Sequence, residues 1–173
     1  MMRFVFNSTA RENFEEIAKA VNLLYKESVP VIVCIGSDLV IGDSLGPIVG
    51  TKLSELLKDK AFVYGTLDNP ITAKEITTVK ETLSSIHPNA KIIVIDAAVG
   101  NKEDVGQVKI SSFGIKPGLG VNKTLPCIGD VSIIGIVKET GNACDSLSLV
   151  RLGLINTLAN DIAKGLSLAF LKI

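Results

Sequence analysis

The sequence predicts a three-layer α/β/α domain with a largely parallel central sheet, and two observations carry this prediction. Helical apolar spacing alternates with short apolar runs three times, before two further strands and a terminal helix. The chain has 173 residues and is 47% hydrophobic, so a single domain over 1–173 can bury a real core. Parallel strands joined through helices then imply right-handed crossovers.

Each helix is predicted from apolar residues that recur every three or four positions. Capping-box sequences at 9–12 and 72–75 open two helices, and Asp43 or Ser44 is the expected N-cap of a third. Each strand is predicted from a β-branched or alternating run, and the third is expected to end at Asp96. In chain order the expected elements are a helix over 10–26, a strand over 31–35, a helix over 45–57, a strand over 61–66, a helix over 72–86, strands over 91–95, 106–112 and 131–137, and a helix from 145 onward.

The composition excludes several classes of protein. Eighteen basic and eighteen acidic residues give no net charge, so no nucleic-acid partner is expected. The single histidine, His87, rules out multi-histidine metal sites. Three cysteines without a C-x-x-C pair argue against a disulfide framework and structural zinc, so we expect a cytoplasmic protein with no cofactor and no bound metal. No apolar run reaches the about 18 residues of a membrane span, so no membrane partner is expected.

Aspartates follow three of the expected strands. Asp38 and Asp43 lie in the loop after the first strand, Asp68 follows the second, and Asp96 directly follows the third. Ligands of open α/β sheets bind outside the carboxyl ends of the strands. Burial next to a strand raises a carboxyl pKa, and two neighbouring carboxyls cannot both ionise cheaply. One can therefore keep its proton while the other acts as a base toward water.

Structural roles remain open for the same four residues. Asp43 is equally suited to cap a helix, and Asp96 to cap a nearby loop amide. Asp38 and Asp68 are typical turn residues.

Glycines are frequent in two loops but form no known phosphate-binding motif. Gly36, Gly42 and Gly46 do not match G-x-G-x-x-G, and no Walker sequence occurs. The segment 114–123 combines glycines with two lysines, so it can offer amides and charge to an anion or oxyanion, or can be only a surface loop. The candidate substrate-binding residues in these loops and after the second strand are Gly36, Ser37, Asp38, Asp68, Gly114, Lys116, Gly118 and Gly120.

Three blocks, at 34–47, 94–97 and 114–121, resemble the germination proteases of spore-forming bacteria in the same order. Over its full length the chain is similar to the short YyaC-type sporulation proteins, which resemble the core of that protease. A more distant similarity runs to hydrogenase maturation endopeptidases. This resemblance implies a phosphorylase/hydrolase-like αβα fold and places the catalytic pair on Asp43 and Asp96.

The resemblance also implies endopeptidase chemistry on a protein or peptide substrate, with small acid-soluble spore proteins as the class, in the forespore or spore core. Hydrogenase maturation enzymes bind nickel through a histidine beside their two acids, and 113–130 contains no histidine. A nickel-dependent activity is therefore not expected. Germination proteases are about twice as long, so their zymogen control and tetramer assembly do not carry over, and homo-oligomer formation stays open.

The leading hypothesis is thus a sporulation-associated, aspartate-dependent endopeptidase. The first alternative is a non-catalytic sporulation factor that binds a peptide or protein in the same cleft. The second is a metal-assisted hydrolase in which Asp38, Asp68 or Asp130 joins the pair around magnesium, manganese or calcium.

Overall fold

The computed structural model describes residues 2–8, 13–26, 29–117, 126–141, 147 and 149–171. Its elements, in chain order, are β1 (Arg3–Asn7), α1 (Asn13–Leu24), β2 (Val31–Cys34), the 3₁₀ helix η1 (Ile41–Asp43), α2 (Leu45–Leu57), the 3₁₀ helix η2 (Lys58–Lys60), β3 (Phe62–Tyr64), α3 (Ile76–Ile86), β4 (Ile92–Gly100), the 3₁₀ helix η3 (Lys102–Asp104), β5 (Gln107–Ser111), β6 (Val131–Glu139) and α4 (Leu152–Leu171).

The strands form one six-stranded sheet in the order β1-β5-β6-β4-β2-β3. Neighbours from β6 through β4 and β2 to β3 are parallel. β5 and β1 are antiparallel additions at the β6 side. The predicted α/β architecture with a largely parallel sheet is therefore confirmed.

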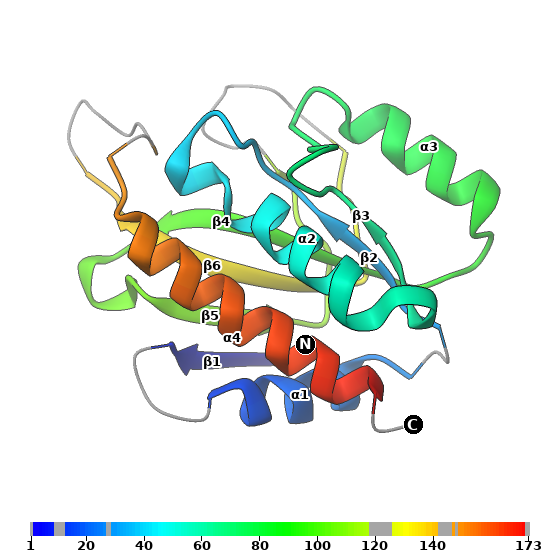
Figure 1. The fold of residues 1–173 in the computed structure, drawn as a ribbon, viewed down its shortest axis with the longest axis horizontal. Coiled ribbons are helices and arrows are strands. Elements are labelled where there is room, and N and C mark those ends of the chain that lie inside the picture. Colours follow the sequence, from blue (N-terminus) through cyan, green and yellow to red (C-terminus); the bar gives the residue numbers. More distant parts are fainter. Residues whose placement is uncertain are drawn as a thin grey trace.

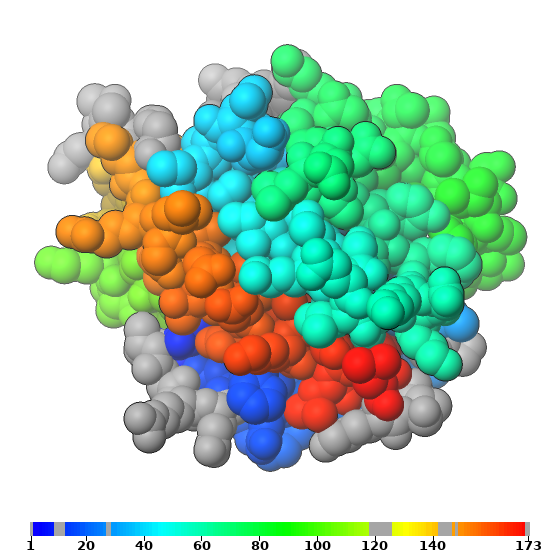
Figure 2. Space-filling view, in the orientation of Figure 1, coloured from blue at the N-terminus to red at the C-terminus, as the bar shows by residue number. Residues whose placement is uncertain are grey.

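Helices cover the sheet unequally. α1, α4 and α2 lie over one face, and α3 lies alone over the other, near β2 and β3 (Figure 1). In the space-filling view the side chains of α1, α4 and α2 form one continuous layer (Figure 2). None of the described helices is both long and apolar enough to cross a membrane.

Each layer has its own apolar core because strand side chains alternate between the two faces. Beneath α1, α2 and α4 the sheet contributes Ile32, Cys34, Ile93, Ile95 and Ile133. Beneath α3 it contributes Val31, Val33, Ile35 and Val94. The apolar runs of the central strands thus match burial on both faces.

β1 is an element that the sequence did not predict. It pairs along its whole length with β5, and its residues alternate between exposed and half-buried. Only Phe4 and Phe6 of this strand pack against the core. Two inward side chains are too short a pattern to distinguish a strand from an irregular terminus.

Several boundaries differ from the prediction, most clearly those of β4, β6 and α4. β4 does not end at Asp96 but runs on to Gly100, and β6 runs to Glu139, because these two strands pair with each other beyond the end of β2. α4 begins at Leu152 rather than at 145. The expected cap at 145–146 lies outside the described residues.

Only half of the capping box predicted at 72–75 forms, and Glu75 rather than Thr72 is the N-cap of α3. The capping box predicted at 9–12 lies outside the described residues. The backbone N–H of Thr72 donates to Glu75 Oε2 over 2.9 Å, and the Thr72 hydroxyl bonds to the same carboxylate. The regular helix starts later than expected, at Ile76, because the intervening residues form a turn.

α2 approaches the sheet more closely than side chains normally allow. A Cβ added to Gly50 would lie 2.0 Å from the carbonyl oxygen of Gly65, and one added to Gly65 would lie 1.9 Å from that of Cys34. A Cβ atom does not fit at either distance, so both positions require glycine.

We predict that Gly50→Ala destabilises the protein by about 1–3 kcal/mol, because the methyl group must displace backbone rather than a side chain. Gly153→Ala is the control: it lies in α4 with nothing within 4 Å of the added Cβ, and should be neutral or stabilising by up to about 1 kcal/mol. Urea unfolding of both variants measures the difference. Equal stability of Gly50→Ala and wild type would contradict the close approach.

Candidate functional site

The loop after β2 folds back on itself at the carboxyl edge of the sheet. Gly36 has φ +147°, and a Cβ there would lie 2.0 Å from the carbonyl oxygen of Asp43. The Gly36 N–H donates to Ile71 O over 2.9 Å, and the Ser37 N–H donates to Asp43 O over 3.1 Å. Glycine is therefore needed where the two ends of the loop meet.

A second close contact seats the start of α2 on the end of β2. A Cβ on Gly46 would lie 2.0 Å from the carbonyl oxygen of Ile35. On the other side, the Gly42 N–H donates to Leu147 O over 2.8 Å, so the segment before α4 holds η1 in place. No sequence motif indicated this contribution of Leu147.

Of the two residues predicted to cap α2, Asp43 and Ser44, the structure has Ser44 at the N-cap. Ser44 occupies the N-cap position, and its side chain makes no capping bond because its hydroxyl donates to Ile41 O over 2.7 Å. Asp43 is the last residue of η1, one position earlier. Its carboxyl is left for the loop rather than for the helix end.

Asp43 is partly buried in this loop. Burial raises the pKa of its carboxyl above the usual value, and a hydrogen bond from the backbone of Ser37 opposes that rise. The loop therefore both desolvates and orients this carboxyl.

Asp96 lies on β4 where β2 stops pairing with it. Cys34 is the last β2 residue in register, opposite Ile95, and the Ile35 N–H donates to Ile95 O over 2.7 Å. One residue later the Ala97 N–H donates to Asp96 Oδ1 over 2.8 Å. Asp96 is thus inside a strand yet at the carboxyl edge of its neighbour, and β4 contacts η1 there. The sequence did not indicate the Ala97 amide.

The two carboxyls interact. Burial raises the pKa of Asp96 to about 8; the Ala97 amide lowers it, and the negative charge of Asp43 raises it again. Burial raises the pKa of Asp96 more strongly than that of Asp43, so Asp43 ionises first and Asp96 keeps its proton at neutral pH. The structure therefore places near each other the two residues that the sequence singled out, and their carboxyls interact electrostatically.

The other candidates from the first two loops differ in whether they contact Asp43. Gly36 and Ser37 contact Asp43 through the backbone, as described above, and the Ser37 hydroxyl accepts the Leu39 N–H over 3.2 Å. Asp38 is an exposed turn residue. Asp68 is also exposed, within a turn closed by two hydrogen bonds of 3.2 Å between the backbones of Thr66 and Asn69.

The glycine-rich segment leaves the sheet at the opposite, amino edge, between the end of β5 and the start of β6. Ile115 and Ile128 exchange two backbone hydrogen bonds of 3.0 and 2.9 Å. A Cβ on Gly114 would lie 2.2 Å from the carbonyl oxygen of Gly129, so Gly114 has a packing role. Lys116 is exposed. Gly118 and Gly120 lie outside the described residues.

No imidazole can join the acid pair. His87, the one histidine of the chain, bonds to the Tyr64 hydroxyl over 2.7 Å and stacks on Phe62, the first residue of β3. It follows α3 and precedes the start of β4, and so lies near the amino edge of the sheet. The described residues contain no group of three or more His, Cys, Asp or Glu side chains arranged to hold a metal ion. Two carboxylates alone do not fit nickel, which prefers nitrogen and sulfur ligands.

Asp130 is also placed away from the pair. Its carboxylate accepts the N–H of Ile92, the first residue of β4, over 2.8 Å. Its own N–H donates to Ile92 O. It caps the amino end of β4 rather than contributing a ligand at the carboxyl edge.

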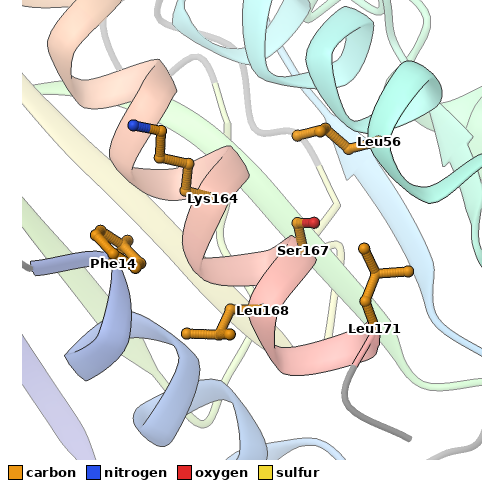
Figure 3. Close-up of a pocket in the computed structure, with 6 residues that line it drawn as sticks. All are labelled: Phe14, Leu56, Lys164, Ser167, Leu168 and Leu171. Atoms are coloured by element: carbon orange, nitrogen blue, oxygen red, sulfur yellow. The ribbon is translucent and has the colours of Figure 1, made fainter.

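An apolar cavity of about 310 Å³ lies near the C-terminal end of α4, between α1 and α2 (Figure 3). Its lining residues are Phe14, Leu56, Lys164, Ser167, Leu168 and Leu171. The start of α4 contacts η1, and Lys164 lies about 18 Å further along the helix. This cavity is not part of the acid-pair site.

The pKa shift of Asp96 predicts how stability depends on pH. Between about pH 4 and pH 8 the unfolded chain has released this proton and the folded chain has not, so the free energy of unfolding falls as pH rises, by up to about 1.4 kcal/mol per pH unit. Asp96→Asn keeps an uncharged side chain that accepts the Ala97 amide, and should remove most of that fall. Urea unfolding at pH 5, 6, 7 and 8 measures it.

Asp38→Asn is the matched control for this prediction, because Asp38 is exposed in the same region of the sheet edge. It should keep the pH dependence of the wild type. A wild type whose stability is level from pH 5 to 8, or an Asp96→Asn variant that falls as steeply, would contradict the assignment.

The fold is shared with a solved enzyme. The crystal structure of the NiFe hydrogenase maturation protease HycI from Thermococcus kodakarensis KOD1 superposes with a TM-score of 0.60, covering 87% of this chain and 97% of that one. The two sequences are 18% identical, so the similarity shows the fold alone. This agrees with the predicted three-layer α/β/α class.

Sequence similarity identifies relatives more directly. The chain is 42% identical over 139 residues to the uncharacterized protein YyaC of Bacillus subtilis strain 168. The aligned region covers 80% of this chain and 68% of YyaC. This confirms the resemblance to YyaC-type proteins. The model of the family described as "Protein of unknown function (DUF1256)" matches residues 5–165, and the chain therefore belongs to this family.

Proposed function

We propose that this protein is an endopeptidase that activates water with the Asp43–Asp96 pair and cleaves a protein substrate in sporulating cells. The observation that carries the proposal is the placement of Asp43 on η1 and Asp96 on β4, two elements in contact at the carboxyl edge of a parallel sheet. The raised pKa of both carboxyls, to about 8 for Asp96, supports it. At neutral pH one of them is a base and the other a proton donor.

The chemistry follows from these protonation states. Asp43 accepts a proton from water as the water oxygen bonds to the scissile carbonyl carbon. Asp96 donates its proton to the carbonyl oxygen, which would otherwise carry the full negative charge of the tetrahedral intermediate. Collapse of the intermediate breaks the C–N bond as the proton held by Asp43 passes to the leaving amine. One hydroxyl of the intermediate returns its proton to Asp96, so the product is a carboxylic acid and both carboxyls regain their starting protonation states.

The comparisons support the reaction class at the level of fold and family. A protease shares the fold, and the sequence relative is the uncharacterized YyaC of Bacillus subtilis. The blocks at 34–47, 94–97 and 114–121 resemble the germination proteases, which degrade small acid-soluble spore proteins. We therefore assign the same substrate class here, with the forespore or spore core as the place of action.

The test is turnover of a purified small acid-soluble spore protein, followed by mass spectrometry of the new termini. Asp43→Asn and Asp96→Asn should each lower kcat/KM by at least about 100-fold, as expected for loss of a general base or acid. Activity of the wild type should decline above about pH 8, where Asp96 loses its proton. A chelator should leave the rate unchanged.

Asp59→Asn is the control, because Asp59 is an exposed residue of η2, at the far end of α2 from Asp43, and it should retain wild-type turnover. Cleavage that survives both Asp43→Asn and Asp96→Asn would eliminate the mechanism. Saturable binding of the spore protein without any cleavage would replace it with the alternative, a non-catalytic factor that binds a polypeptide.

A further inference from the structure

We propose that the free edge of β4 beyond Ile95, formed by the backbone of Ala97 and Val99, binds the substrate as an extended strand beside the acid pair. This inference rests on the proposed function and specifies its substrate class, an unfolded stretch of polypeptide. It rests on where the β2–β4 ladder stops and on which backbone groups are left at that point.

The ladder fixes the direction of the backbone groups. Ile95 faces β2, because its carbonyl accepts the Ile35 N–H over 2.7 Å. N–H and C=O groups alternate sides along a strand, so Ala97 and Val99 face the same side as Ile95. Asp96 and Ala98 face β6 instead, where they stand opposite Ile134 and Ile136.

β2 does not continue alongside these residues. After Ile35 the chain turns at Gly36, whose N–H donates to Ile71 on the far side of β2. Within the described ranges, no strand pairs with this side of β4 after Ile95. β4 therefore extends past β2 toward η1 (Figure 1).

The first backbone N–H of this edge, that of Ala97, donates to the carboxyl of Asp96. In a longer ladder the Ala97 N–H would donate to the carbonyl of Ile35; here it donates to Asp96 Oδ1 over 2.8 Å. The carboxyl proposed as proton donor thus lies at the edge where an added strand would place its carbonyl groups. A peptide paired with Ala97 and Val99 would bring a scissile bond to the acid pair.

This edge of β4 is exposed at Val99, and β6 holds the strand in place from its other side. Val99 is 37% exposed, and β4 remains paired with β6 through Gly100, with a register shift between Ala98 and Val99. Such irregularities are common beside active sites because they redirect a strand locally. The side chains from 97 to 99 are Ala, Ala and Val, so no charge restricts which peptide can pair.

Recognition through main-chain hydrogen bonds selects conformation more than sequence. An added strand would donate to the carbonyls of Ala97 and Val99 and accept from the Val99 N–H. A helical or folded segment has already used these groups internally. The site therefore favours a polypeptide that is unfolded when it is cleaved.

The test uses the full chain carrying Asp43→Asn, which binds without turnover, and a mixture of random dodecapeptides with blocked termini as the probe. Hydrogen exchange at the Val99 amide, followed by NMR, should slow at least tenfold when the peptides are added. In the same background Val99→Pro, which removes only a donor on the free side of β4, should weaken binding by about tenfold. Val99→Leu keeps the amide and should bind as before.

A mixture in which every peptide amide is N-methylated provides a second measurement that does not depend on a variant. It cannot donate to the carbonyls of the edge and should not bind. Unchanged exchange at Val99 with the unmethylated peptides, or equal binding of methylated and unmethylated mixtures, would overturn the inference.

The two proposals fail in different ways. Protection of Val99 by peptides that the wild type never cleaves would support the edge site and reject the endopeptidase activity. Cleavage of the spore protein without any protection of Val99 would do the reverse.

Discussion

The close approach of α2 to the end of β2 is the constraint on which the site depends. Gly46 rests on the carbonyl of Ile35, and Gly36 allows the loop to return against the backbone of Asp43. A side chain at either position would push η1 away from the sheet. Asp43 would then no longer face β4, and the carboxyl of Asp96 would lose the neighbouring charge that raises its pKa.

The different behaviour of the two carboxyls follows from the elements that carry them. Asp43 sits in a loop and receives a hydrogen bond from Ser37, which stabilises its charged form. Asp96 sits on a central strand, where desolvation outweighs the single bond from Ala97. Because one carboxyl is on a loop and the other on a strand, their pKa values differ before any substrate binds. General acid–base chemistry needs this difference.

Much of the fold could be predicted because central parallel strands are buried on both faces and read as continuous β-branched runs. The ends of the elements were less predictable, since they depend on partners distant in sequence. Asp96 appeared to end its strand because the apolar run stops there, but pairing with β6 carries β4 on to Gly100. The rule that polar groups follow strand ends nevertheless located it, because β2 does end at that level.

The two acidic residues of the candidate site could be picked out from the sequence, whereas the backbone groups that hold them in place could not. Asp43 was equally consistent with a helix cap, and only the structure shows that it ends η1, with Ser44 at the N-cap of α2. The supporting amide of Ala97 and the carbonyl of Leu147 are backbone groups, which carry no residue-specific signal. Gly36, Gly42 and Gly46 were noted in the sequence, but their spacing matches no known motif and did not indicate close packing.

The most direct measurement of the central claim is a site-resolved carbon NMR titration of the Asp43 and Asp96 carboxyls. The account predicts that Asp43 titrates first, that Asp96 titrates near pH 8, and that Asp43→Asn lowers the pKa of Asp96. Independent titration of both carboxyls near pH 4, with Asp96 unaffected by Asp43→Asn, would contradict it.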